Sequence, residues 1–161
     1  MTTVLVDLEN LVVASDSRRS RGDADSIDFV YLDNTRKIYT SNNGNTIIAG
    51  AGLLSDLLEA VAYGEVPKKS TSLLLKVQRF PLKIELYRGR ELLEKHTRLT
   101  LWNAWISFGS GARKLNEDTS IDWNAMSAED LIKKACELDE YSGGEVQQMS
   151  ISDGYLYEDI H

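Results

Sequence analysis

Alternating apolar and polar positions run along most of the chain, which is the pattern of half-buried β-strands. Together with short apolar runs and turn residues, this pattern predicts strands at residues 2–8, 11–14, 27–32, 36–40, 46–52, 81–88, 97–102, 104–108, 146–152 and 155–157. The first two strands form a hairpin that begins at the N-terminus itself. Residues 70–80 and 91–96 fit either a strand or a short helix, and the polar residues 19–26 predict a loop.

Helical spacing occurs in two stretches. In residues 53–63 the leucines and Val61 fall on one stripe, as in an amphipathic helix. Ser127 opens a second helix with a pattern similar to a capping box, and the glycines of residues 142–144 end it. The order of strands, helix, strands, helix and strands favours an α+β layered domain with antiparallel sheets. A chain of 161 residues suits one such domain, with a sizeable core.

Composition narrows the class of protein further. Hydrophobic residues make up 42% and charged residues 27%, which is ordinary for a soluble globular protein. No apolar run is long enough to cross a bilayer, and the N-terminus lacks the pattern of a secretory signal. The single cysteine, Cys136, cannot form an internal disulfide. We therefore expect a cytoplasmic or similarly reducing location and no membrane partner.

The charge pattern argues against two classes of site. A net charge of −7 is unfavourable for a nucleic-acid surface, which needs clustered lysine and arginine. Short basic clusters at residues 18–19 and 68–69 are interpreted as solvated loops. Two histidines and one cysteine give no zinc-ligand spacing, and no EF-hand pattern occurs. A site of carboxylates alone could still hold Mg²⁺ or Ca²⁺, but we expect neither a metal nor a cofactor.

The first residues carry the candidate chemistry. Thr2 follows Met1 at the head of a β-prone run. If Met1 is removed, Thr2 carries a free α-amine and a hydroxyl on adjacent carbons. That arrangement is a nucleophile with its own general base attached.

Several short segments fit one known pattern when they are taken in order. They cover residues 2–4, 14–18, 34–38, 49–52, 109–111 and 139–144. In this order they resemble the proteasome β-type subunits and the bacterial HslV-type peptidases, which are N-terminal-nucleophile hydrolases. The resemblance implies a four-layer αββα sandwich of two antiparallel sheets, formed by residues 1–161 as one domain with reduced helices. The second long helix of the family would shrink to residues 70–80 at most, and the helix after the Gly-Ser-Gly turn would be missing.

The resemblance also assigns roles near the nucleophile. Thr2 Oγ1 would attack a peptide carbonyl, and its α-amine would be the general base. Lys37 would lower the pKa values of nearby groups and stabilise the alkoxide, while Asp16 would pair with Lys37. The backbone N–H of Gly52 would bind the oxyanion.

Further residues would position the amine and the substrate. Ser110, Asp139 and Ser142 would hydrogen-bond around the Thr2 amine. Ser20 would hold the substrate as an added strand, and Gly50 would lie at the wall of the S1 pocket. Taken singly, most of these residues have an ordinary structural explanation, such as a surface ion pair, a turn residue or a helix cap. Their coincidence with one mechanism favours the catalytic interpretation.

Three functions follow from this interpretation. The first is a threonine endopeptidase whose subunits form a self-compartmentalising homo-oligomeric ring, fed with polypeptide substrates by an AAA+ unfoldase ATPase. The second is a catalytically inactive ring protein of the same fold that keeps Met1. The third is a different N-terminal-nucleophile amidohydrolase acting on a small amide.

Overall fold

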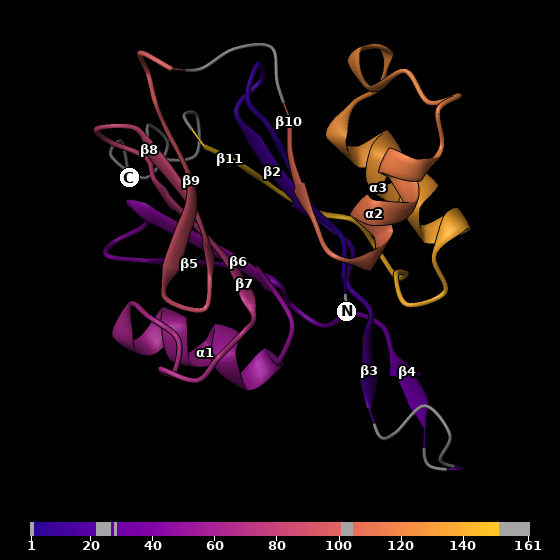
Figure 1. Ribbon diagram of the computed structural model, residues 1–161, viewed down its shortest axis with the longest axis horizontal. Coiled ribbons are helices and arrows are strands. Elements are labelled where there is room, and N and C mark those ends of the chain that lie inside the picture. The colour runs from indigo at the N-terminus through magenta and orange to yellow at the C-terminus, as the bar shows by residue number, and fades with distance from the viewer. Residues whose placement is uncertain (1, 22–26, 28, 101–104, 152–161) are drawn as a thin grey trace.

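The structure is a computed structural model that describes residues 2–21, 27, 29–100 and 105–151. Within them, two antiparallel sheets pack face to face (Figure 1). One sheet has the order β10-β1-β2-β11 and consists of β1 (Val4–Asp7), β2 (Val12–Ser15), β10 (Trp105–Phe108) and β11 (Gln147–Ser150). The other sheet runs in chain order and consists of β5 (Ile38–Ser41), β6 (Thr46–Ala51), β7 (Leu73–Gln78), β8 (Lys83–Arg88) and β9 (Glu91–Thr97).

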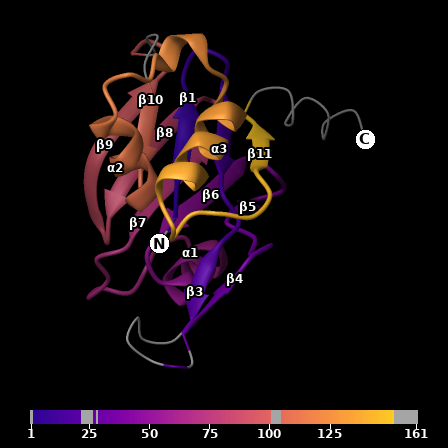
Figure 2. The same ribbon diagram turned by 90° about the vertical axis from the view of Figure 1, so that its right-hand side faces the viewer.

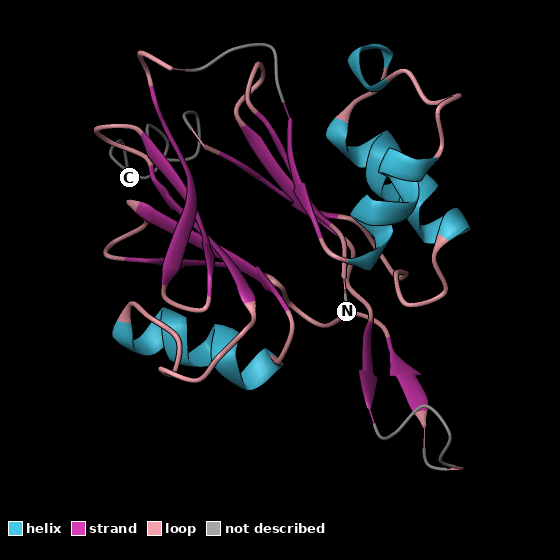
Figure 3. Ribbon diagram, in the orientation of Figure 1, coloured by secondary structure: helices cyan, strands magenta, loops and turns pink. Residues whose placement is uncertain are grey.

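Helices cover the outer faces of both sheets (Figure 3). Helix α1 (Leu54–Tyr63) packs on the β5–β9 sheet, whereas α2 (Ser110–Glu117) and α3 (Ala128–Leu138) pack on the other sheet. A short 3-10 helix, η1 (Trp123–Ala125), precedes α3. The predicted α+β class and the four-layer αββα sandwich are therefore confirmed.

A separate two-stranded hairpin projects from the sandwich. It consists of β3 (Arg19–Arg21) and β4 (Val30–Leu32), and it points away from both sheets in Figures 1 and 2. Arg18 fixes its base, because Nε donates to Asp33 at 2.7 Å and Nη1 donates to the carbonyl of Glu140 at 2.9 Å. The guanidinium also holds the pKa of Asp33 below its usual value.

The alternation of side chains in β1 explains the layers. Val4 and Val6 face the core between the two sheets, while Leu5 faces the core under α2 and α3. Successive residues of a strand point to opposite faces, and both faces of β1 are covered. All three side chains are therefore fully buried. A third apolar cluster, which includes Leu57 and Leu74, joins α1 to the outer face of the other sheet.

Several sequence predictions differ from the structure. By sequence alone, residues 70–80 fit either a strand or a short helix. Residues 73–78 form the strand β7, so the reduced second helix that the resemblance implied is wrong. They lie inside the sheet with apolar neighbours on both faces, so their apolar run lacks the alternation that distinguishes a strand. The helix after the Gly-Ser-Gly turn is present as α2, with Ala112 and Leu115 packed on α3 and an otherwise polar surface that hid the period. Residues 19–21 form β3 instead of a loop.

Other predictions hold in part. The strands on either side of Asn34 exist but belong to different sheets, since β4 pairs with β3 and β5 pairs with β6. Helix α3 begins as predicted, and Ser127 Oγ accepts the N–H of Asp130 at 3.1 Å. The predicted strand at residues 155–157, like residues 22–26, 101–104 and 152, lies outside the described residues. Within the described part, no helix is long and apolar enough to cross a membrane.

Candidate active site

Chain direction brings the predicted site residues to one edge of the sandwich. Thr2 lies just before β1, Asp16 directly follows β2, and Gly109 directly follows β10. Because both neighbours of β1 are antiparallel to it, its start lies beside their ends. In the other sheet, Lys37 directly precedes β5 and Gly52 directly follows β6, so these two also share an edge. The two edges meet where the chain begins (Figure 1).

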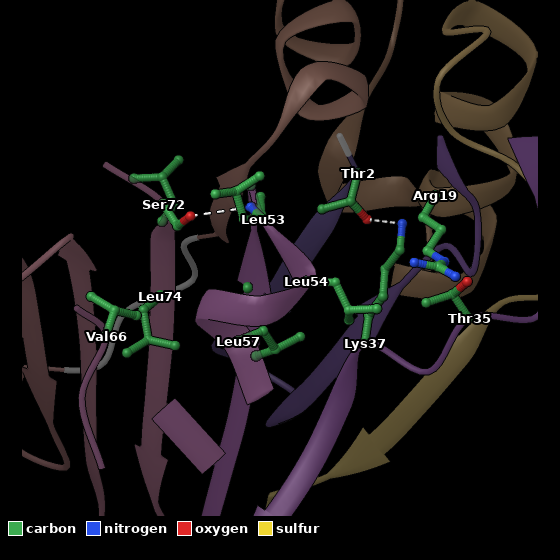
Figure 4. Close-up of a pocket in the computed structure, with 14 residues that line it drawn as sticks. Thr2, Arg19, Thr35, Lys37, Leu53, Leu54, Leu57, Val66, Ser72 and Leu74 are labelled. Atoms are coloured by element: carbon green, nitrogen blue, oxygen red, sulfur yellow. Dashed lines mark hydrogen bonds between the residues drawn. The ribbon is translucent and has the colours of Figure 1, made fainter. Parts of the chain in front are cut away.

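Thr2, Asp16 and Lys37 form one buried cluster at this edge. The hydroxyl of Thr2 donates to Asp16 Oδ1 and accepts from Lys37 Nζ, as Figure 4 shows for the lysine. Lys37 Nζ also lies 2.8 Å from Asp16 Oδ1, and the side chains of this ion pair are 6% and 0% exposed. Asp16 and Lys37, which the sequence predicts as a pair, lie side by side, and both groups contact the Thr2 hydroxyl.

Backbone donors hold the Asp16 carboxylate in place. Oδ1 accepts the N–H of Thr3 at 3.0 Å, and Oδ2 accepts those of Gly143 at 3.0 Å and Arg18 at 3.3 Å. Gly143 belongs to the segment after α3, so the carboxylate ties the start of the chain to a segment near its end. A carboxylate with this many donors has one fixed position.

Lys37 is held from the opposite sheet. Its backbone N–H donates to Gln147 Oε1 at 2.9 Å, and Gln147 Nε2 donates to the carbonyl of Thr35 at 2.7 Å. Burial lowers the pKa of Lys37, and the charge of Asp16 acts in the opposite direction. Gln147 was not singled out in the sequence, because a side-chain amide in a strand carries no signal of a partner 110 positions away.

Ser110, Asp139 and Ser142 form a second network. Asp139 Oδ2 accepts the hydroxyl of Ser110 at 2.6 Å and that of Ser142 at 2.8 Å. Ser142 Oγ in turn lies 2.8 Å from Thr3 Oγ1. The structure therefore brings the three predicted residues together, but the described hydrogen bonds connect them to Thr3, one position after Thr2. Sequence reasoning assigned no role to the Thr3 side chain.

The backbone at Gly109 passes close to Thr2. Its φ is +97°, and a Cβ at this position would overlap the carbonyl oxygen of Thr2. Only glycine combines this conformation with the missing side chain. The glycine before Ser110 thus permits the contact between the end of β10 and the start of the chain.

A hydrogen-bonded chain fixes the loop that contains Gly52. Ser72 Oγ accepts the N–H of Leu53 at 3.2 Å (Figure 4). The same hydroxyl donates to Asp56 Oδ2 at 2.7 Å. Ser70 Oγ donates to the same carboxylate oxygen at 2.6 Å. Gly52 has a φ of +130°, and a Cβ there would lie 2.8 Å from Ser72 Cβ. Asp56, which is 7% exposed, therefore orients the Gly52 loop through Ser72.

An apolar pocket opens beside Thr2 (Figure 4). Its apolar walls are made by Leu54, Leu57, Val66, Leu73 and Leu74. Gly50 lies at the wall, where a Cβ would be 3.1 Å from the carbonyl oxygen of Leu73 and 3.3 Å from Leu57 Cδ1. Ser20, on β3, lines a wider groove that also includes Thr2, Gly52 and Ser110.

Sequence comparisons identify no relative, whereas structural comparisons do. No family model and no curated protein matches the chain. Among solved structures, Thiobacillus denitrificans BPH aligns with 94% of this chain and 99% of its own at 16% identity, with a TM-score of 0.61. A structure of BPH in complex with epoxomicin aligns with 93% of this chain and 99% of its own at 14% identity, with a TM-score of 0.56.

Eukaryotic HslV from Trypanosoma brucei is also similar. The alignment covers 91% of this chain and 97% of that chain at 13% identity, with a TM-score of 0.54. At these identities the likeness concerns the fold. It agrees with the αββα sandwich and with the resemblance noted in the sequence. The protein therefore has the fold of the HslV-type N-terminal-nucleophile hydrolases.

Proposed function

We propose that the protein is an N-terminal threonine endopeptidase, with residues 1–161 acting as one catalytic domain. The observation that carries this proposal is the position of the Thr2 hydroxyl. It is hydrogen-bonded to the ammonium of Lys37 and the carboxylate of Asp16, beside an apolar pocket. A buried hydroxyl between two charged groups of opposite sign is a costly arrangement for stability alone, and it suits a nucleophile.

The proposed reaction begins once Met1 has been removed. The free α-amine of Thr2 takes the proton from Oγ1, and Oγ1 attacks the scissile carbonyl to give a tetrahedral oxyanion. The N–H of Gly52 stabilises this oxyanion. Its collapse transfers the proton from the α-amine to the leaving amine and leaves an ester on Oγ1. Water, activated by the same amine, hydrolyses the ester and restores the hydroxyl.

Lys37 and Asp16 support these steps through charge and position. The positive charge of Lys37, in contact with Oγ1, favours the alkoxide and lowers the pKa of the nearby α-amine, so that this amine is neutral at working pH. Asp16 fixes the positions of the Thr2 hydroxyl and the Lys37 ammonium relative to each other. Ser110, Asp139 and Ser142 act through Thr3, which fixes the direction in which the chain approaches its nucleophile.

The substrate and partners are proposed on separate grounds. The apolar pocket beside Thr2 suits an apolar side chain at the P1 position of a polypeptide. Ser20 lies on β3, which pairs only with β4 among the described strands, so its other edge suits main-chain pairing with an extended substrate. A homo-oligomeric ring, an AAA+ unfoldase partner and a cytoplasmic location rest on the resemblance to the HslV-type peptidases.

Two measurements on one preparation test the proposal. Intact mass reports whether Met1 is removed, and a fluorogenic peptide with leucine at P1 reports turnover. We expect a mass without the initiator methionine and turnover that Thr2→Ala abolishes and Thr2→Ser retains. To separate loss of processing from loss of chemistry, the chain is also released from a cleavable tag that leaves Thr2 first.

Failure of that processed chain to cleave any peptide would refute the peptidase. Retention of Met1 in the chain made without the tag would favour the inactive ring protein. Faster hydrolysis of small amides than of peptides would favour the third function.

A further inference from the structure

Basic side chains surround the groove that contains Thr2. The residues that line it include Arg19 from β3, Lys69 from the segment between α1 and β7, and Arg88 from the end of β8. Two of the three belong to the basic clusters that the sequence alone assigns to solvated loops. Three separate segments thus place positive charge around one groove.

Among the described residues that line the groove, no exposed side chain is acidic. Asp56 is the acidic residue among those that line it, and it is buried, with Oδ2 accepting hydrogen bonds from Ser70 and Ser72. Lys69 and Arg88 are exposed and Arg19 is half-buried. None of these three cations forms an ion pair with another described residue. Their charges are therefore available to a ligand.

The rest of the chain makes this local charge distinctive. The protein has 25 acidic and 18 basic residues and a net charge of −7. A basic groove on an acidic protein is not a consequence of overall composition. It attracts acidic ligands to the groove while the remaining surface repels them.

The three cations take different places around the apolar pocket and the groove. Arg19 lines both the apolar pocket and the groove, so it stands at their junction, whereas Lys69 and Arg88 line the groove alone. Figure 4 shows Arg19 on the Thr35 and Lys37 side of the pocket, across from Val66 and Leu74. The pocket itself has leucine and valine walls. The basic side chains of the groove therefore act on the substrate residues that flank the one bound in the apolar pocket.

We propose that the groove selects acidic polypeptide segments, in which glutamate or aspartate flanks the apolar residue at the cleavage point. This inference rests on the proposed peptidase function and names its substrate class. Guanidinium groups bind carboxylates through paired hydrogen bonds, and lysine acts as a point charge. Since these cations are partly solvated, their effect is on capture of the substrate and falls as salt rises.

Matched peptides test the selection. Each has leucine at P1 and differs only in the flanking residues, which are glutamate, glutamine or lysine. At low salt we expect kcat/KM for the glutamate peptide to exceed that for the lysine peptide about tenfold, with the ratio falling to about twofold near 1 M salt. The change should lie in KM rather than kcat.

Charge-reversed variants locate the effect. The double variant Lys69→Glu with Arg88→Glu should reverse the preference. Arg98→Glu is the matched control, because Arg98 is exposed and follows β9, which starts opposite Arg88 and runs about 20 Å away from it. An equal loss of preference in the control would overturn a groove-specific effect.

Binding separates this inference from the proposed function. The same peptides, fluorescently labelled, are titrated against the Thr2→Ala variant, which does not depend on turnover. Cleavage or binding without charge preference would overturn the inference and leave the peptidase standing. Absence of cleavage together with preferred binding of the glutamate peptide, lost in the double variant, would refute the peptidase and support the groove.

Discussion

Replacing Asp16 with asparagine tests the geometry of the site without any assay of activity. The carboxylate is fully buried and lies 2.8 Å from the ammonium of Lys37. An asparagine side chain of the same shape removes the charge and turns one acceptor into an N–H donor. That donor would face the backbone donors of Thr3 or Gly143, or the ammonium itself. The variant therefore contains a buried cation with no counter-charge.

The expected cost is large relative to the stability of a domain. Removing one partner of a buried ion pair costs about 3–5 kcal/mol, from a total that is typically about 5–15 kcal/mol. With a urea m-value of about 2 kcal/mol per M, the unfolding midpoint should fall by roughly 1.5–2.5 M. Circular dichroism at increasing urea and pH 7 measures this shift.

A second substitution separates charge from shape. Combining Asp16→Asn with Lys37→Met removes the uncompensated cation, so the double variant should recover part of the lost stability. A double variant less stable than Asp16→Asn alone would contradict the reasoning. So would a loss below about 1 kcal/mol in the single variant, which is the size of an exposed pair.

The pH dependence has a defined sign. Burial lowers the pKa of Lys37 in the folded state, so between that pKa and the unfolded value the unfolded chain binds more protons and stability rises with pH. Loss of the Asp16 charge lowers the folded pKa of Lys37 further, which extends this window to lower pH. The deficit of Asp16→Asn should therefore narrow as the pH increases from 7 to 9.5. Adding Lys37→Met should remove that trend.

Three further predictions concern other parts of the chain. Gly52→Ala should lower kcat/KM about 100-fold or more, because its Cβ would displace Ser72, whereas Gly64→Ala, with a φ of +86° and nothing within 4 Å of its Cβ, should keep activity. Ser127→Ala should lower the free energy of unfolding by about 1 kcal/mol through loss of the helix cap and leave peptide turnover unchanged. Burial raises the pKa of Cys136 to about 11, so only about 0.1% of the thiol is ionised at pH 8 and alkylation, followed by mass, should be far slower than in urea.

The sequence predicted the parts of the fold in which local pattern and tertiary environment agree. β1 and β2 are buried on both faces, but they are short runs rich in β-prone valine that end at turn residues, and α1 and α3 each have one apolar stripe. β7 has apolar contacts on both faces, so its pattern was ambiguous until its neighbours were known. The eight residues of α2 are too few and too polar for their period to be recognised.

The residues of the site also fall into those that the sequence predicts and those that it does not. Thr2, Asp16 and Lys37 could be proposed because the order of short motifs resembles a known family. Three contacts could not be proposed: the hydrogen bond between Gln147 and the backbone of Lys37, that between Ser72 and the backbone of Leu53, and that between Thr3 and Ser142. Each depends on a side chain meeting another segment at hydrogen-bond distance, which only the packing of the sheets determines.

Because of where β1 lies, the site around Thr2 exists only in the folded protein. Both edges of β1 are paired, and its side chains fill the cores on both faces of the sheet. Chain ends usually fray first, but here the backbone of the first strand can exchange its amide hydrogens only when the whole sandwich opens. A partly folded chain therefore has no assembled nucleophile, and the proposed peptidase cannot act on other proteins before its own folding is complete.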